Sequence, residues 1–177
     1  MFSYTLSILF FLANVTTETT LDIPLSLRRL LQSTSVRKLQ NEGGLLSEAA
    51  VDAYLDSIKE VVEDDVSAGT TVRSVVLASL TQVNDILQFV AAITLEVSCD
   101  SDPCNEAEAE SDALGQVDSS IQTSLLDGSL ETALETNLMD VDECGAAFDS
   151  CTAFQESAAM ATATTEVFQR EYILYDL

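Results

Sequence analysis

The fold is decided by residues 87–98, which read LQFVAAITLEVS. Every odd-numbered residue from Leu87 to Val97 is apolar, whereas the even-numbered residues mix polar side chains with small and β-branched ones. A period of two over this length predicts a strand with one buried face. The residues upstream are also rich in β-branched types, which favour strands. We therefore expect a hairpin of two strands, 71–80 and 86–98.

Helices are predicted on both sides of this hairpin. Ser47 is a typical N-cap, and the apolar residues that follow it recur every three or four positions as far as Gly69. Beyond the hairpin, acids in a first turn and an apolar stripe predict a second helix, interrupted at 127–129 and continued by a short piece over 130–138. Residues 172–175 have the composition of a further strand.

This order of elements resembles the SEA-type, ferredoxin-like sandwich of extracellular modules. The resemblance implies an α+β fold made of a helix, a strand hairpin, a helix and a C-terminal edge strand. SEA modules that cleave themselves carry a Gly-Ser step between the paired strands, whereas residues 81–85 here read TQVND, so self-cleavage is not implied. The alternative is an all-α four-helix bundle, because the large residues of 72–98 also fit one helical stripe.

Four cysteines, Cys99, Cys104, Cys144 and Cys151, predict two disulfides, with three possible pairings. We favour the local pairs, Cys99 with Cys104 and Cys144 with Cys151. The second pair requires 141–152 to be a loop, because seven helical residues would place the two Cα atoms about 10.5 Å apart, beyond the reach of a disulfide. A four-cysteine zinc site is disfavoured, because structural zinc sites space each cysteine pair more closely.

The N-terminal residues predict secretion. The apolar run 6–13 has the length of the core of a signal peptide and is too short to span a membrane. Four of the seven cations, Arg28, Arg29, Arg37 and Lys38, follow it. We expect a basic pro-segment that is processed at these dibasic pairs. The alternative is a short amphipathic helix whose cations pair with the acidic body.

These observations divide the chain into four parts. We expect a signal peptide over 1–17, a basic pro-segment or flexible leader over 18–44, an acidic α+β domain over 45–140, and a C-terminal extension over 141–177, either packed on the domain or separate from it. The Gly-Gly step before residue 45 is a typical breaker, so the ordered domain is expected to begin there. No later segment is apolar enough to span a membrane.

Composition excludes several classes of function. The chain has 177 residues, with 30 Asp and Glu against 7 Lys and Arg, a net charge of −23 and no histidine. Nucleic acid is an unsuitable partner, because its binding depends on cations that neutralise phosphates. The chain has no histidine, nucleophile elbow, phosphate-binding loop or dinucleotide motif, so an enzyme is hard to assemble from these residues. A hydrolase with paired carboxylates is the alternative, but the acids are so abundant that no particular pair is singled out. We expect neither an enzyme nor a cofactor.

The acids gather in two groups, namely Asp100, Asp102, Glu106, Glu108, Glu110 and Asp112, and Asp140, Asp142, Glu143 and Asp149. Dense carboxylates attract hard cations such as calcium, weakly and without a closed cage. An EF-hand loop is excluded, because Pro103 follows its first acids, and Asn105 and Ser111 replace its glycine and its bidentate glutamate. The sequence therefore predicts diffuse cation binding and no defined metal site.

Several segments also resemble acidic secreted proteins of diatoms, over about residues 45–138. The resemblance is carried by SLRRLLQ at 26–32, VRKLQ at 36–40, ITLEVSCDSDPC at 93–104 and SSIQTSLLDGSLETAL at 119–134. It implies an extracellular structural or binding role, associated with a cell wall or matrix, with weak binding of calcium.

A second hypothesis is a secreted effector or inhibitor that binds a foreign protein. Oomycete effectors resemble this layout, because they carry an Arg-x-Leu-Arg motif after the signal peptide. In this chain Leu31 and Gln40 stand where that motif has its last arginine. The wall or matrix role is therefore favoured over the effector role.

Overall fold

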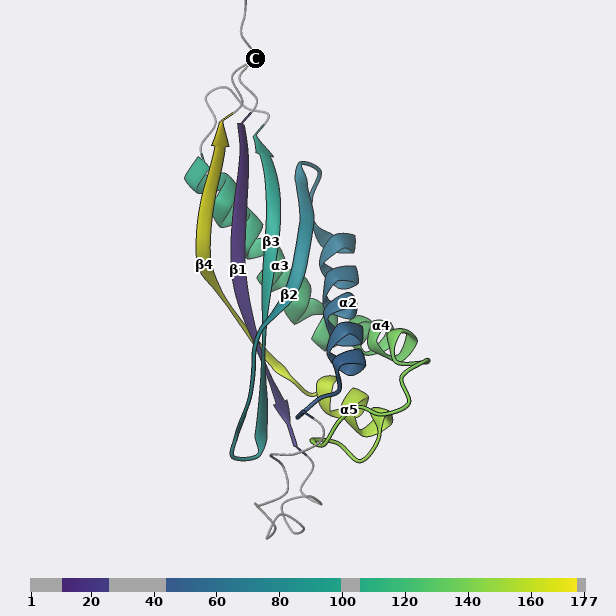
Figure 1. The fold of residues 1–177 in the computed structure, drawn as a ribbon. Helices are drawn as coiled ribbons and strands as arrows, with labels where there is room; N and C mark the ends of the chain where they lie inside the picture. The colour runs from purple at the N-terminus through teal and green to yellow at the C-terminus, as the bar shows by residue number, and fades with distance from the viewer. Residues whose placement is uncertain (1–10, 26–43, 100–105, 175–177) are drawn as a thin grey trace, which may run out of the picture.

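The computed structural model describes residues 11–25, 44–99 and 106–174. In these ranges four strands form one antiparallel sheet, and four helices lie on one side of it (Figure 1). The elements in chain order are β1 (Phe11–Pro24), α2 (Glu48–Asp65), β2 (Thr70–Val83), β3 (Ile86–Cys99), α3 (Glu106–Asp127), α4 (Ser129–Asn137), α5 (Cys151–Ala158) and β4 (Thr162–Leu174).

The strands lie in the order β2-β3-β1-β4, and every neighbouring pair is antiparallel. With the helices between them, this is the split βαββαβ arrangement of ferredoxin-like folds, extended by α4 and α5 before the last strand. The predicted α+β fold class is confirmed. The four-helix alternative is wrong, because residues 72–98 form β2 and β3, and not a helix.

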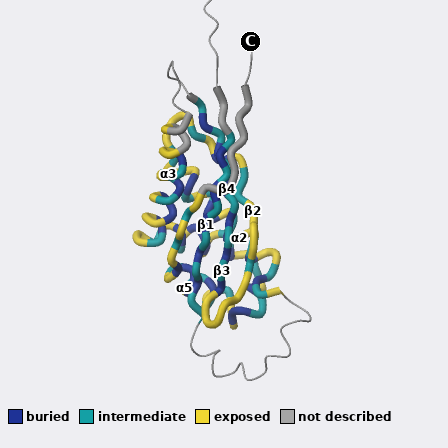
Figure 2. The backbone as a smooth tube through the Cα atoms, turned by 90° about the vertical axis from the view of Figure 1, so that its left-hand side faces the viewer, coloured by how far each residue is buried: buried dark blue, intermediate teal, exposed yellow. Residues whose placement is uncertain are grey.

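The apolar face of β3 lies at the centre of the core, as its alternation predicted. Its inward residues from Leu87 to Val97 are all buried, and in Figure 2 buried and partly buried positions alternate along the central strands. Tyr54 of α2 packs edge-on against Phe89 of β3 and Phe154 of α5, with ring centroids 4.8 and 5.5 Å apart. This aromatic cluster joins the sheet to helices from both halves of the chain.

The start of α2 also agrees with the sequence. The Ser47 hydroxyl accepts a hydrogen bond from the Ala50 amide at 3.2 Å, which is the geometry of an N-cap. The helix ends at Asp65, earlier than expected, and Gly69 with a φ of 99° lies in the turn into β2. Glycine is favoured there because a side chain would strain a left-handed backbone.

The expected beginning of the ordered domain near residue 45 is wrong. Residues 11–24 form β1, a central strand of the sheet, although they fall in the segments predicted as signal peptide and leader. Its inward residues are Val15, Thr17, Thr19, Leu21 and Ile23, all buried. Two of these are threonines, so the apolar alternation that marks β3 is weaker in β1.

The C-terminal residues belong to the same fold. β4 begins at Thr162, ten residues before the predicted strand at 172–175, and pairs with β1 along most of its length. A shift in register between Thr16 and Thr17 is absorbed by a bulge on this edge. The prediction of a C-terminal edge strand is therefore confirmed, in a longer form.

Replacing Tyr54 by phenylalanine should stabilise the protein. The Tyr54 hydroxyl is buried, and no described residue forms a hydrogen bond with it. Burial of such a group costs about 1–3 kcal/mol, so we expect Tyr54→Phe to raise the free energy of unfolding by about 1 kcal/mol. Urea unfolding monitored by circular dichroism would measure the change, and a loss of stability would show that the hydroxyl has a partner.

The same variant should differ from the parent at alkaline pH. Burial raises the pKa of Tyr54 above its ordinary value, so the folded protein keeps the phenol neutral while the unfolded chain ionises near pH 10. This contribution to stability is present below about pH 10 and is lost as the pH rises further, by about 1.4 kcal/mol per pH unit. The free energy of unfolding of Tyr54→Phe should not show this loss. If the free energies of unfolding of the two proteins fell equally with pH above about pH 10, the Tyr54 phenol would not be buried in the folded protein.

Candidate functional site

The sheet has one covered face and one open face. α2 and α3 lie against the inward face, and no described element lies over the other (Figures 1 and 2). Alternation and register place a series of hydroxyl side chains on the open face, namely Thr16, Thr20, Thr71, Ser74, Ser79, Thr81, Thr94, Thr162 and Thr164. The open face is thus broad and rich in hydroxyl groups.

Several polar groups on the open face bind one another across strands. The hydroxyls of Thr16 and Thr94 lie 3.1 Å apart, and the Gln88 amide donates to Asp22 at 3.0 Å. The Arg73 Nε, at a bulge in β2, donates to Glu96 at 3.0 Å. These cross-strand pairs fix the register of the sheet.

One pair of side chains on the open face consists of two acids that face each other across neighbouring strands. Glu18 of β1 and Glu166 of β4 are register partners, with Ala92 on the other side of Glu18. Like charges that face each other across a sheet are unfavourable. The centre of the open face is therefore negatively charged, between rows of threonines.

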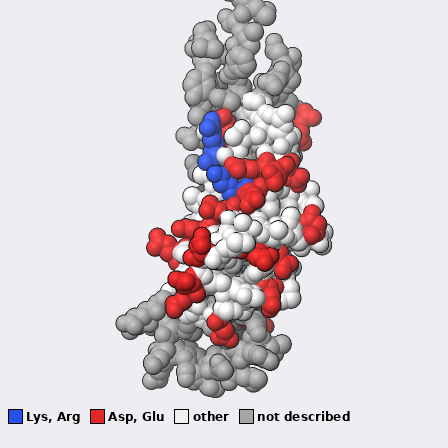
Figure 3. Space-filling view, turned by 90° about the vertical axis from the view of Figure 1, so that its right-hand side faces the viewer, with Lys and Arg blue, Asp and Glu red and all other residues white. Residues whose placement is uncertain are grey.

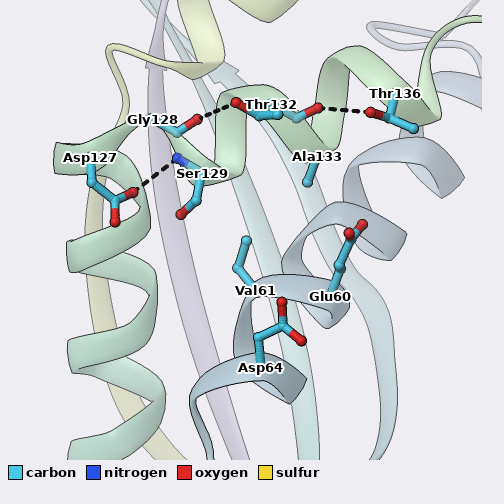
Figure 4. A pocket seen from close by; sticks show the side chains of 9 residues that line it. All are labelled: Glu60, Val61, Asp64, Asp127, Gly128, Ser129, Thr132, Ala133 and Thr136. Carbon is cyan, nitrogen blue, oxygen red and sulfur yellow. Dashed lines mark hydrogen bonds between the residues drawn. The ribbon is translucent and has the colours of Figure 1, made fainter.

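The helical side of the molecule carries a second candidate surface. A hollow of about 480 Å³ lies between α2 and α4, next to the junction of α3 and α4 (Figure 4). Carboxylates of Glu60, Asp64 and Asp127 line it. Asp64 and Asp127 also line a smaller neighbouring hollow of about 170 Å³, whose other lining groups include hydroxyls of α3. Figure 3 shows acidic side chains over much of the described part of the face that includes α2, with a small basic patch among them.

The local structure at this hollow depends on a helix junction. Gly128, with a φ of 80°, precedes α4, and the Ser129 amide donates to the Asp127 carboxylate at 2.9 Å. The hydrogen bond from the Ser129 amide is the largest cause that lowers the pKa of Asp127 below its ordinary value. Thr132 and Thr136 donate their hydroxyl protons to backbone carbonyls along α4. The hollow is thus anionic and offers no basic group of its own.

The structure separates the two acidic groups that the sequence singled out. In the first group, Glu108 and Asp112 are exposed on α3, and Asp100 and Asp102 lie outside the described residues. The second group lies in and beside the loop between α4 and α5. Across the described ranges no set of three or more acids or cysteines is arranged to hold a metal ion.

The acids that line this hollow, Glu60, Asp64 and Asp127, were missed by the sequence analysis. The signal present in the sequence is that Glu60 and Asp64 are one helical turn apart, on the polar side of α2. That they share a hollow with Asp127 depends on the packing of α2 against α4, which no local pattern reveals.

A disulfide joins Cys144 to Cys151, with the Cα atoms 5.0 Å apart, so this local pairing is confirmed. Residues 138–150 form the loop that the pairing required. The loop packs on the start of α2, where the Ser47 hydroxyl donates to the Glu143 carbonyl at 2.6 Å and the Ala147 amide donates to the Leu45 carbonyl at 2.9 Å. The disulfide thus stabilises the contact between the loop and α2.

Most of the other predicted site residues lie outside the described residues. This holds for Arg28, Arg29, Arg37 and Lys38, and for Cys104. The backbone of Cys99 ends β3, and its predicted pairing with Cys104 stays a prediction. Among the described helices, none is long and apolar enough to cross a membrane.

Comparison with known proteins does not assign the chain to a family. No family model matches it, and no curated protein is similar to it. A solved structure, an amidase of the hydantoinase/carbamoylase family from Burkholderia multivorans, aligns with 94% of this chain at 9% identity and a TM-score of 0.28. The chain spans 30% of the length of that protein. A likeness at this level carries no inference about fold or activity.

Proposed function

We propose that this chain is a secreted, non-enzymatic domain that binds extracellular material, such as a cell wall or matrix, through broad surfaces. The observation that supports this function best is the open face of the sheet, which presents hydroxyl side chains from all four strands. Hydroxyls in a regular array form many weak hydrogen bonds with a polar polymer, so an extended surface suits an extended partner.

The acidic helical side supports the second part of the proposal, weak cation binding. Glu60, Asp64 and Asp127 share one hollow without a basic residue among its lining groups. Carboxylates in this arrangement concentrate calcium near the surface, so the cation serves as a bridge to an anionic partner.

The Cys144–Cys151 disulfide supports the extracellular part of the proposal. Disulfides persist in oxidising compartments and are rare where thiols are kept reduced.

Binding of the purified full chain to isolated insoluble wall material tests this function. We expect the parent to sediment with the material and to be released in part by a calcium chelator. Thr20→Arg combined with Thr164→Arg, at register partners on the open face, should reduce the bound fraction. Glu60→Gln combined with Asp64→Asn should remove only the part that depends on calcium.

Two results would overturn the proposal. One is a parent protein that stays in solution with the wall material and forms a stoichiometric complex with one foreign protein, which would favour the effector or inhibitor role. The other is retention that all the variants share unchanged, since neither surface would then be involved.

A further inference from the structure

The strand β1 is bound to the rest of the molecule along both of its edges. Every residue from Phe11 to Pro24 has a register partner in β3, and those from Phe11 to Asp22 are also aligned with β4. The Leu25 amide adds a hydrogen bond to the Asp85 carbonyl at 2.8 Å, in the turn of the β2–β3 hairpin. β1 therefore fills a slot between two strands that are not paired with each other.

The inward side chains of β1 fill the core below this slot. Val15, Leu21 and Ile23 have at most 1% of their surface exposed, and so do the two threonines between them. The Thr19 hydroxyl lies 3.1 Å from that of Thr165 in β4, which gives the slot a polar contact at its centre. The slot thus selects an extended segment with the inward pattern Val, Thr, Thr, Leu, Ile.

β4 depends on β1 for its place in the sheet. Among the described strands its one neighbour is β1, so removal of β1 would leave both β3 and β4 with an unpaired edge and the core exposed. Exposed edges and apolar surface are costly in water. The body of the domain therefore favours the state in which the slot is occupied.

We propose that the slot between β3 and β4 is a strand-binding site, and that residues 11–25 stay bound in it when the chain is cut between Leu25 and Gly44. The predicted dibasic sites, at Arg28–Arg29 and Arg37–Lys38, lie in this interval of the sequence. Processing there yields a domain of two chains held together by the sheet, and does not release a leader. This inference does not depend on the proposed function.

A cut at one introduced position tests the inference. A recognition sequence for a specific protease is inserted between Ser35 and Val36 of the full chain, and the protein is cut to completion. We expect both fragments to co-elute from a sizing column under native conditions, with both masses present, and to separate in denaturant. Loss of the N-terminal fragment from a protein that was folded before the cut would overturn the proposal.

Exchange of a labelled peptide tests the specificity of the slot. A synthetic peptide of residues 11–25 should replace the N-terminal fragment of the cut protein. A peptide with Leu21→Asn places an amide in the core and should bind about 100-fold more weakly. A peptide with Thr20→Asn changes the open face and should bind within about fivefold of the parent peptide. Equal binding of all three peptides would show that the slot does not distinguish the inward side chains of the strand, and would overturn the proposal.

Discussion

Phe89→Ala is expected to lower the free energy of unfolding by about 3–5 kcal/mol, because it removes a fully buried ring and leaves a cavity in the core. Phe89 lies on the inward face of β3, at a centroid distance of 4.8 Å from Tyr54. Loss of the ring therefore weakens the contact between the sheet and α2. Equilibrium unfolding in urea, followed by far-UV circular dichroism, would measure the change.

The neighbouring residue provides the matched control. Val90 follows Phe89 in the same strand but points to the open face, where it is partly exposed. Val90→Ala removes apolar volume without opening a buried cavity, so we expect a loss below about 1 kcal/mol. If Phe89→Ala and Val90→Ala lowered the free energy of unfolding by the same amount, the open face of β3 would have to be covered.

Gly145→Ala is the second substitution for which we expect a large effect, a loss of about 3 kcal/mol or more. Gly145 has a φ of 98°, and a Cβ atom built on it would lie 2.6 Å from the Leu46 Cα and from the Ser47 nitrogen. These are backbone atoms at the start of α2, so they cannot move aside as a flexible side chain would. The loop that carries the disulfide would have to separate from α2.

The control for this variant is Gly115→Ala. Gly115 lies within α3, and outside the backbone of its own helix turn no atom is within 4 Å of the position that its Cβ would take. Alanine favours helix over glycine by about 1 kcal/mol, so this variant should be slightly more stable than the parent. Thermal unfolding of both variants, with the disulfide intact, would separate the two effects. A Gly145→Ala protein as stable as the parent would contradict the close approach of the loop.

Local patterns in the sequence were sufficient to predict the helix and the strands in the middle of the chain. The strict alternation from Leu87 to Val97 identified β3 because one of its faces is completely buried. The N-cap at Ser47 and the stripe after it identified α2. These features are determined by residues close in sequence, which is where periodicity is informative.

The central strand could not be identified in this way. In β1 the inward positions include Thr17 and Thr19, and the residues before it have the composition of a signal peptide. Its strand partners, β3 and β4, are far away in sequence.

The hollow near Asp127 also depends on segments that are distant in sequence, because it lies where α2 and α4 pack together. Contacts between distant segments leave no periodic trace in one sequence.

Because β1 pairs with β4, the sheet can be completed only late in the synthesis of the chain. The hydroxyls of Thr19 and Thr165 meet across 146 residues of chain, and β1 remains without one of its two neighbours until β4 is present. During synthesis from the N-terminus, the sheet therefore closes only after nearly all of the described residues have been made. A chain of this topology therefore completes its sheet only at the end of its synthesis, and β1 stays half-paired until then.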